Sequence, residues 1–387
     1  MMVSQRIAFI DSRINIEYIN EIMTVEQKIG GVFTINDNKV VPSTSLFTED
    51  LTHATMCAKK FLDNFSYSCD LVFIEILDDS GSKANINSLL IALEWCLENS
   101  IKLINLSIGT TSFVDIPQLH TKINNLVANR TIIVSASSNR NKMTFPAFFS
   151  NVIGVRALGD KLIRSGFEYD DSNIDGIEIS CYISNEVVKY KDKYHVLPCT
   201  NSLAAPAISA KVCSLINEGC SSLYEIKTKL KEQSLSTSHI WQKKMYLKYF
   251  KEKINIPIIA IIEDDEINLL VQKFLSKFED CGYSGICISE NYKTDILIRV
   301  INLLDFESYD ITEKLHFYSH YCNVDYVIVH IGNDMLKNLK LKDIDVVINN
   351  IKYKNQMYKQ KIQYITFQTH KDFDSLFTEV YNYLSKE

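Results

Sequence analysis

Four short segments carry side chains that could together hydrolyse a peptide bond. Asp11 closes an apolar run, His53 precedes small residues, Asn139 follows a small polar run, and Ser202 precedes Leu-Ala-Ala-Pro. A serine hydroxyl attacks a carbonyl only if a base, usually histidine, takes its proton. A carboxylate must orient that histidine, and hydrogen-bond donors must meet the developing oxyanion. The four residue types therefore match the needs of a serine nucleophile.

Each of these residues also has an ordinary structural explanation. Asp11 could cap a turn, a lone histidine such as His53 is more often structural, and Ser202 could be a simple helix N-cap. Ser202 also opens a helical segment, where the helix dipole stabilises negative charge. The order Asp, His, Ser is that of subtilisin and differs from the orders in chymotrypsin and the α/β-hydrolases. The order favours the catalytic interpretation over the separate structural ones.

The chain resembles the subtilase family of serine peptidases over about residues 5–235. Its motifs are similar to the family's Asp-Ser/Thr-Gly, His-Gly-Thr-x-x-Ala, Asn-x-Ser-Leu-Gly, Ala-Ala-Gly-Asn and Gly-Thr-Ser-Met-Ala-Ala-Pro segments, in the same sequence order. Tyr-Pro-Ala and Val-Ile-x-Val segments of the family have counterparts as well. The corresponding segments here are 7–12, 53–58, 104–109, 136–139, 200–206, 145–147 and 151–155.

The resemblance implies a role for each of these side chains. Ser202 would be the nucleophile, His53 the base and Asp11 the group that orients His53, while Asn139 would donate to the oxyanion. A further stretch would pair its backbone with an extended substrate and line the specificity pocket. That stretch consists of Ser107, Ile108 and Gly109.

Four positions depart from the family pattern because they lack glycine. They are Arg13, Ala54, Ser138 and Thr200. Glycine is needed where the backbone has positive φ or another group approaches closely. The losses leave open an alternative, a catalytically inactive subtilase-fold protein that binds peptides or regulates. The expected function is that of an intracellular serine endopeptidase, with precursors that carry leader peptides as a possible substrate class to be tested.

The elements that must position these residues follow from hydrophobic patterning. Short apolar runs alternate with helical periods, which predicts an α/β fold with a parallel sheet wound by crossover helices. The family resemblance implies that this is a subtilisin-like parallel sheet with helices on both faces. We expect strands at 6–10, 71–77, 103–107, 131–135 and 151–155, and helices at 53–64, 86–98, 117–129, 202–217 and 223–233.

A second, smaller α/β domain is expected after residue 250, so the predicted domains are 1–250 and 251–387. We expect strands at 258–262, 285–289, 325–330 and 344–348, and a helix at 266–278. The acids at 263–265 resemble the start of a receiver domain, but the strand at 325–330 ends in His330 where a receiver carries aspartate. No GxxxxGK[ST] phosphate loop occurs. The expected role is a degenerate receiver-like or P-loop-like module that binds a partner or the substrate.

Composition narrows the class of protein. The 387 residues carry 41 Lys and Arg against 47 Asp and Glu, a net charge of −6, which gives no basic surface for nucleic acid or anionic membrane. No apolar stretch reaches the roughly 20 residues of a membrane span. The ten cysteines form no CxxC pair, so reduced thiols in a cytoplasmic protein are expected. Because Asp11 stands so early in the sequence, we expect neither a signal peptide nor a pro-segment. No cofactor or metal is expected, and the expected partner is a peptide or precursor protein.

Overall fold

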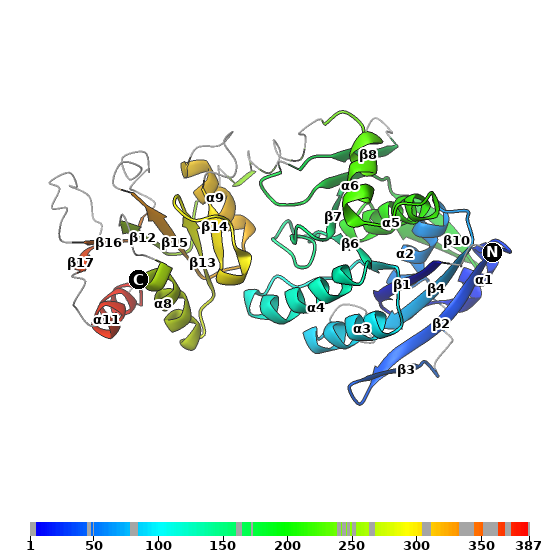
Figure 1. The fold of residues 1–387 in the computed structure, drawn as a ribbon, viewed down its shortest axis with the longest axis horizontal. Coiled ribbons are helices and arrows are strands. Elements are labelled where there is room, and N and C mark those ends of the chain that lie inside the picture. The colour runs from blue at the N-terminus through cyan, green and yellow to red at the C-terminus, as the bar shows by residue number, and fades with distance from the viewer. Residues whose placement is uncertain are drawn as a thin grey trace. The chain divides into compact units, whose positions relative to one another are not determined.

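The computed structural model describes residues 5–44, 48, 50–77, 84–159, 165–171, 173–237, 241, 245, 248–249, 253–262, 268–303, 311–332, 344–350, 363–367 and 373–385. The chain divides into two compact units, 1–239 and 240–387 (Figure 1). Each unit is described by itself.

The first unit is built on a nine-stranded sheet with the order β3-β2-β4-β1-β5-β6-β7-β9-β8. Neighbours from β2 to β9 run parallel, and β3 and β8 are antiparallel edge strands. A two-stranded hairpin, β10-β11, stands apart. The strands are β1 (Gln5–Asp11), β2 (Gln27–Asn36), β3 (Lys39–Pro42), β4 (Cys69–Glu75), β5 (Leu103–Leu106), β6 (Ile132–Ala136), β7 (Ile153–Leu158), β8 (Gly166–Tyr169), β9 (Ile179–Tyr182), β10 (Glu186–Tyr190) and β11 (Lys193–Leu197).

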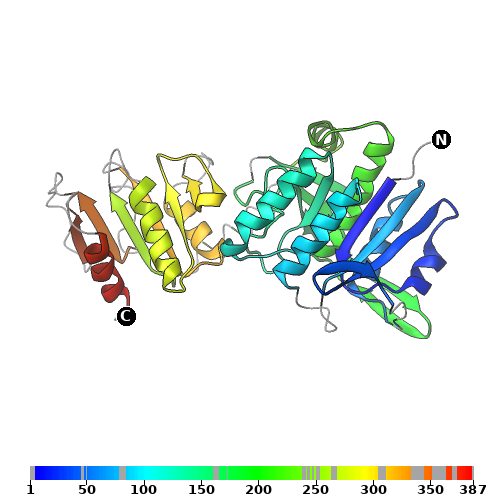
Figure 2. The same ribbon diagram turned by 60° about the horizontal axis from the view of Figure 1, so that its bottom comes forward.

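Helices cover both faces of this sheet, which explains why its central strands are apolar throughout. Ile7 and Phe9 of β1 pack in one core with residues of α2 and α5. Ala8 and Ile10 point to the opposite face, which α3 and α4 cover side by side (Figure 2). The helices are α1 (Ile16–Ile22), α2 (His53–Leu62), α3 (Ile86–Glu98), α4 (Ile116–Ala128), α5 (Asn201–Asn217) and α6 (Leu223–Glu232), with a 3₁₀ turn η1 (Phe113–Asp115). The predicted fold class is confirmed.

The candidate residues gather because parallel strands end at the same edge of a sheet. Asp11 is the last residue of β1, and Ser107 directly follows β5. His53 is the first residue of α2, whose N-cap Thr52 accepts a hydrogen bond from a backbone amide in the first turn. Ser202 is the second residue of α5. Strand ends and helix starts thus meet at one edge.

The sequence prediction missed several strands at the margins of this sheet. Strand β2 contains the pair Gly30-Gly31, which weakens a strand pattern, and its register with β4 shifts between Ile29 and Gly31. The hairpin β10-β11 is largely exposed on one side, so it lacks a continuous apolar run. Hydrophobicity alone therefore found the buried centre of the sheet and not its edges.

The second unit contains a six-stranded, wholly parallel sheet with the order β14-β13-β15-β12-β16-β17. In the flavodoxin-like order the second strand lies beside the first, whereas here β15 separates β13 from β12. Its strands are β12 (Ile258–Ile262), β13 (Gly285–Ser289), β14 (Val300–Asn302), β15 (Tyr326–Ile331), β16 (Val346–Asn350) and β17 (Gln363–Phe367). Its helices are α8 (Asn268–Asp280), α9 (Ile311–Tyr321) and α11 (Phe373–Leu384), with a 3₁₀ turn η2 (Ile296–Ile298).

The acids at 263–265, on which the receiver comparison rests, lie outside the described residues. Among the helices of the described ranges, none combines the length and the apolar composition needed to cross a bilayer.

Candidate active site

Asp11 and His53 form a close pair at the carboxyl edge of the sheet. His53 Nδ1 lies 2.8 Å from Asp11 Oδ1 and 2.9 Å from Oδ2. The Asp11 side chain is 1% exposed and also accepts from the Ser12 amide, whereas the His53 side chain is 28% exposed. A neutral imidazole that donates from Nδ1 keeps the lone pair on Nε2. Contact between Nδ1 and the Asp11 carboxylate therefore favours, in neutral His53, the tautomer that a general base needs.

Charge around this pair favours protonated His53. Negative charge on Cys57 and on Asp11 raises the pKa of His53, against burial, which lowers it. Burial also raises the pKa of the Cys57 thiol. The thiol is then uncharged at neutral pH, so the negative charge that acts on His53 under those conditions is the Asp11 carboxylate.

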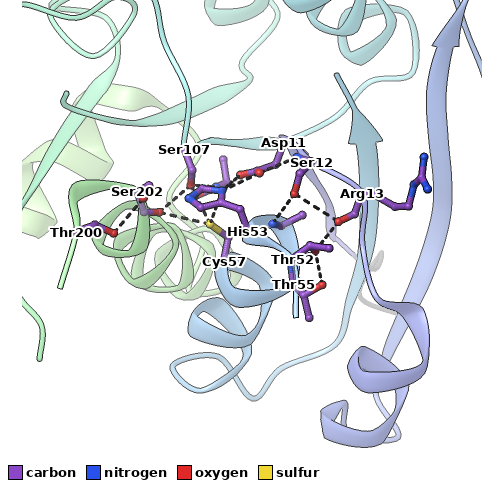
Figure 3. Close-up of polar contacts among 12 residues, drawn as sticks. Asp11, Ser12, Arg13, Thr52, His53, Thr55, Cys57, Ser107, Thr200 and Ser202 are labelled. Carbon is purple, nitrogen blue, oxygen red and sulfur yellow. Dashed lines mark hydrogen bonds and ion pairs between the residues drawn. The ribbon is translucent and has the colours of Figure 1, made fainter. Parts of the chain in front are cut away.

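Ser202 lies beside this pair, but its hydroxyl points to another partner. Ser202 Oγ is 3.0 Å from Thr200 Oγ1, and no hydrogen bond within the described residues joins it to His53. Cys57 connects the two, because its Sγ lies 3.8 Å from His53 Nδ1 and 3.5 Å from the Ser202 carbonyl oxygen (Figure 3). The structure thus brings all three predicted triad residues together, with the serine and histidine in neighbouring but unbonded positions.

Buried hydrogen bonds fix the backbone of Ser202. Ser107 Oγ donates to the Ser202 carbonyl at 2.8 Å, and Asn105 Nδ2 donates to Ser107 Oγ at 3.0 Å. Asn105 Oδ1 in turn accepts from Ser209 Oγ, further along α5. The side chain of Ser107 therefore supports the helix start, which leaves its backbone for any contact with a substrate.

Asn139, the candidate oxyanion donor, is hydrogen-bonded to the start of the same helix, and Asn201 adds further bonds there. Asn139 Oδ1 accepts from the Asn201 amide at 2.8 Å, so its own NH₂ group stays available. Asn201 Nδ2 donates to the Ser138 carbonyl, and Asn201 Oδ1 accepts from the Ala157 amide, both at 2.8 Å. The Ser202 amide, second in α5, has no acceptor within the helix. Asn139 Nδ2 and the Ser202 amide are therefore the two candidate donors for an oxyanion.

The predicted substrate strand is an open edge next to a pocket. Neither Ile108 nor Gly109 belongs to a strand ladder of the described residues; pairing resumes at the bridge between Thr110 and Phe145. A Cβ on Gly109 would come within 2.6 Å of the Phe145 carbonyl oxygen, so this site requires glycine. The adjoining pocket has a volume of about 300 Å³ and is lined by Ala84, Asn85, Ile86, Leu89, Ile108, Gly109, Thr110, Thr111 and Asp115.

The four residues that stand where the family has glycine do not have the strained, positive φ angles that favour glycine. None of Arg13, Ala54, Ser138 and Thr200 is among the residues with positive φ. Arg13 instead directs its Nε to Glu75 at 3.2 Å, and Thr200 has an extended backbone with φ −130°. The site therefore accommodates these side chains with ordinary backbone geometry.

Sequence reasoning missed the contributions of Cys57, Thr200 and Asn201. Cys57 follows His53 by four residues, which places both on one face of α2, so spacing could have revealed it. The hydrogen bonds of Thr200 and Asn201 depend on side-chain orientation, for which the sequence carries no signal.

Comparison with known proteins adds to this geometry. A family model described as the subtilase family matches residues 5–249. The minor extracellular protease Epr of Bacillus subtilis (strain 168) is 27% identical over 181 residues, 44% of this chain and 27% of that protein. The major intracellular serine protease of the same organism is 25% identical over 150 residues, 36% of this chain and 44% of that protein. The chain thus spans less than half the length of these relatives.

A solved structure described as a lanthipeptide protease is 14% identical, covers 60% of this chain and 81% of that chain, and has a TM-score of 0.47. The family match covers more than half of the 387 residues. The predicted resemblance is confirmed, and the chain belongs to the subtilase family.

Proposed function

We propose that the chain is a serine endopeptidase in which Ser202 attacks the substrate, His53 moves the proton and Asp11 orients His53. The observation that carries this proposal is the bond from His53 Nδ1 to the buried Asp11 carboxylate, at 2.8 Å, beside the start of α5. Family membership supports the same chemistry. Two features of the geometry support it as well: the His53 ring is held by Asp11, and Ser202 lies at a helix N-terminus, where developing negative charge is stabilised.

The proposed reaction begins with rotation of the Ser202 hydroxyl from Thr200 toward His53 Nε2. His53 takes the hydroxyl proton as Oγ attacks the carbonyl carbon, and the oxyanion meets Asn139 Nδ2 and the Ser202 amide. His53 then protonates the leaving amine, and water hydrolyses the acyl-enzyme by the same steps. The Asp11 carboxylate stabilises the imidazolium throughout without taking its proton.

The substrate is proposed to be an extended segment of a peptide or precursor protein. Its backbone would pair with Ser107–Gly109, an open edge that offers main-chain hydrogen bonds. The pocket beside Gly109 combines apolar walls from Leu89 and Ile108 with the carboxylate of Asp115, which accepts from Thr110 Oγ1 at 2.7 Å. A side chain with an apolar stem and a basic end fits this lining.

Covalent labelling tests the proposal. A fluorophosphonate probe should label the purified full chain at Ser202, and His53→Ala should abolish the labelling at pH 6–9, the range around the working pKa of a histidine base. Ser202→Ala serves as the site control. An unlabelled wild-type chain across that range would exclude the peptidase proposal.

A second candidate is a peptide-binding protein without turnover. The bond between Ser202 Oγ and Thr200, in place of one to His53, favours it. Such a protein would retain affinity for extended peptides at Ser107–Gly109 while the labelling experiment fails.

The finer proposals concern location and substrate. All ten cysteines are free, as expected for a reducing compartment such as the cytoplasm. We propose a dedicated maturation role, such as leader removal, with residues 251–387 acting as a module that binds the substrate or a partner. Mass spectrometry of peptides cut by wild type but not by Ser202→Ala would identify the substrate and test both ideas.

A further inference from the structure

Cys57 places a third metal-ligating group directly against the proposed base. Its Sγ lies 3.8 Å from His53 Nδ1, on the side where that nitrogen also meets Asp11. The candidate ligand atoms of Asp11, His53 and Cys57 all lie within 4.8 Å of one another, and no other such group of His, Cys, Asp or Glu occurs in the described part of the chain. The peptidase chemistry proposed above assigns no task to the thiol.

The spacing of these atoms suits a tetrahedral zinc ion. With zinc bonds of about 2.0–2.3 Å, neighbouring ligand atoms lie about 3.3–3.7 Å apart. The Cys57 Sγ to His53 Nδ1 distance of 3.8 Å is close to that range, and the Nδ1 to Asp11 distance of 2.8 Å must open slightly. A carboxylate, a thiolate and a neutral imidazole also carry two negative charges. They would neutralise a divalent cation, which removes the main cost of placing it in a buried site.

We propose that Asp11, His53 and Cys57 form an inhibitory site for Zn²⁺. On binding, the Cys57 thiol releases its proton to solvent, and the proton on His53 Nδ1 leaves as one is taken up at Nε2. The ion thus takes the place of the Nδ1 proton and is held by Asp11, Nδ1 and the thiolate. Nε2 then carries a proton and cannot accept the one from Ser202, so the base is held in the wrong tautomer. The inhibition rests on the proposed function, whereas the binding does not.

The route to this site runs past the His53 ring. Asp11 and Cys57 are buried, whereas the His53 side chain is 28% exposed. Cys57 Sγ also lies 3.3 Å from Ser107 Oγ and 3.5 Å from the Ser202 carbonyl oxygen. In its thiol form Cys57 donates toward these oxygens, which hold it on the side of α2 that faces the nucleophile, and it gives up both contacts when the thiolate turns toward the ion.

Cadmium binding to the full chain carrying Ser202→Ala tests the site without any need for activity. Cd²⁺ is a spectroscopic probe for zinc, because a cadmium–thiolate bond gives an ultraviolet charge-transfer band. We expect a band that saturates at one Cd²⁺ per chain and that Zn²⁺ displaces. Adding Cys57→Ser should remove the band, because the thiolate ligand is gone, and should lower affinity by more than the about 10- to 100-fold that loss of an outer-shell partner typically costs. Cys96→Ala, which removes a buried cysteine of α3, is the matched control.

Activity gives the second measurement, each variant being compared with its own metal-free rate. Zn²⁺ should inhibit the wild type and Cys96→Ala alike, and Cys57→Ser or Cys57→Val should need at least tenfold more Zn²⁺. A charge-transfer band that persists in Ser202→Ala/Cys57→Ser, or that never forms in Ser202→Ala, would overturn the site. If the wild type has no activity but Ser202→Ala binds Cd²⁺ through Cys57, the metal site stands and the peptidase proposal fails. Thermal unfolding of each variant verifies that it is folded.

Discussion

Each unit of this chain contains a histidine in contact with a polar side chain at the ends of parallel strands. In the second unit His330 Nδ1 lies 2.8 Å from Ser289 Oγ, across the neighbouring strands β15 and β13. In the first unit His53 Nδ1 lies at the same distance from Asp11. The same nitrogen therefore meets a hydroxyl in one unit and a carboxylate in the other.

The difference shows what separates a serine–histidine contact from a catalytic arrangement. Ser289 and His330 are 0% and 1% exposed, so no substrate can reach the hydroxyl. A base must present Nε2 to the nucleophile and keep Nδ1 for an orienting carboxylate. His53 meets the second condition through Asp11 on Nδ1, its side chain is 28% exposed, and the proposed function assigns its Nε2 to Ser202. Exposure and the identity of the Nδ1 partner thus matter more than a short distance between serine and histidine.

The largest expected effect comes from removing the charge that distinguishes the two histidines. Asp11→Asn should lower kcat about 10⁴-fold, because the amide stabilises the wrong tautomer and not the imidazolium. Peptide cleavage under saturating substrate measures it. Ser289→Ala, which alters the buried pair of the second unit, should leave kcat unchanged. Equal losses in the two variants would show that the comparison between the units is mistaken.

Loss of an oxyanion donor should have the next largest effect. Asn139→Ala should lower kcat about 10²–10³-fold with little change in KM, because the role proposed for Asn139 Nδ2 is to stabilise the charge of the transition state. The matched control is Asn151→Ala, whose exposed amide donates to Asn124 Oδ1. A rise in KM at constant kcat would instead assign Asn139 to ground-state binding.

The candidate triad and oxyanion residues could be predicted from the sequence, whereas the contacts that hold them in place could not. Asp11, His53, Asn139 and Ser202 stand in family motifs, and apolar runs located the central strands that bring them together. Cys57 and Ser202 are 145 residues apart, so their contact depends on how α2 packs against α5. The direction of a hydroxyl rotor depends on such packing too, which periodicity does not encode.

The sequence also could not show that the backbone of the site tolerates the replacement of these glycines. The family pattern implied positive φ or close approach at Arg13 and Thr200, but the backbone there is ordinary. Gly109 is the reverse case, because the Phe145 carbonyl oxygen excludes a Cβ. The sequence shows which residues are glycine, but it does not show at which positions the structure requires glycine.

The pH profile should show the charge on His53 directly. The base works only when neutral, so kcat/KM should fall tenfold per pH unit below the pKa of His53. The Asp11 carboxylate raises the pKa of His53, so the midpoint should move down in Asp11→Asn, in which the carboxylate is gone. A midpoint that stays in place in Asp11→Asn would contradict the electrostatic account of the pair.

The smallest expected effect concerns the Thr200 hydroxyl, which is hydrogen-bonded to Ser202 Oγ. Thr200→Val keeps the shape of the side chain but removes its bond to Ser202 Oγ. A neutral hydrogen bond contributes about 1 kcal/mol, so freeing Ser202 to turn toward His53 should speed fluorophosphonate labelling about fivefold. Thr228→Val on α6, whose hydroxyl donates to the Tyr224 carbonyl, is the control. Slower labelling in Thr200→Val would mean that Thr200 holds the nucleophile in its attacking orientation. The contact with Thr200 would then prepare Ser202 for catalysis and would not restrain it. Such preparation would distinguish Ser202 from Ser289.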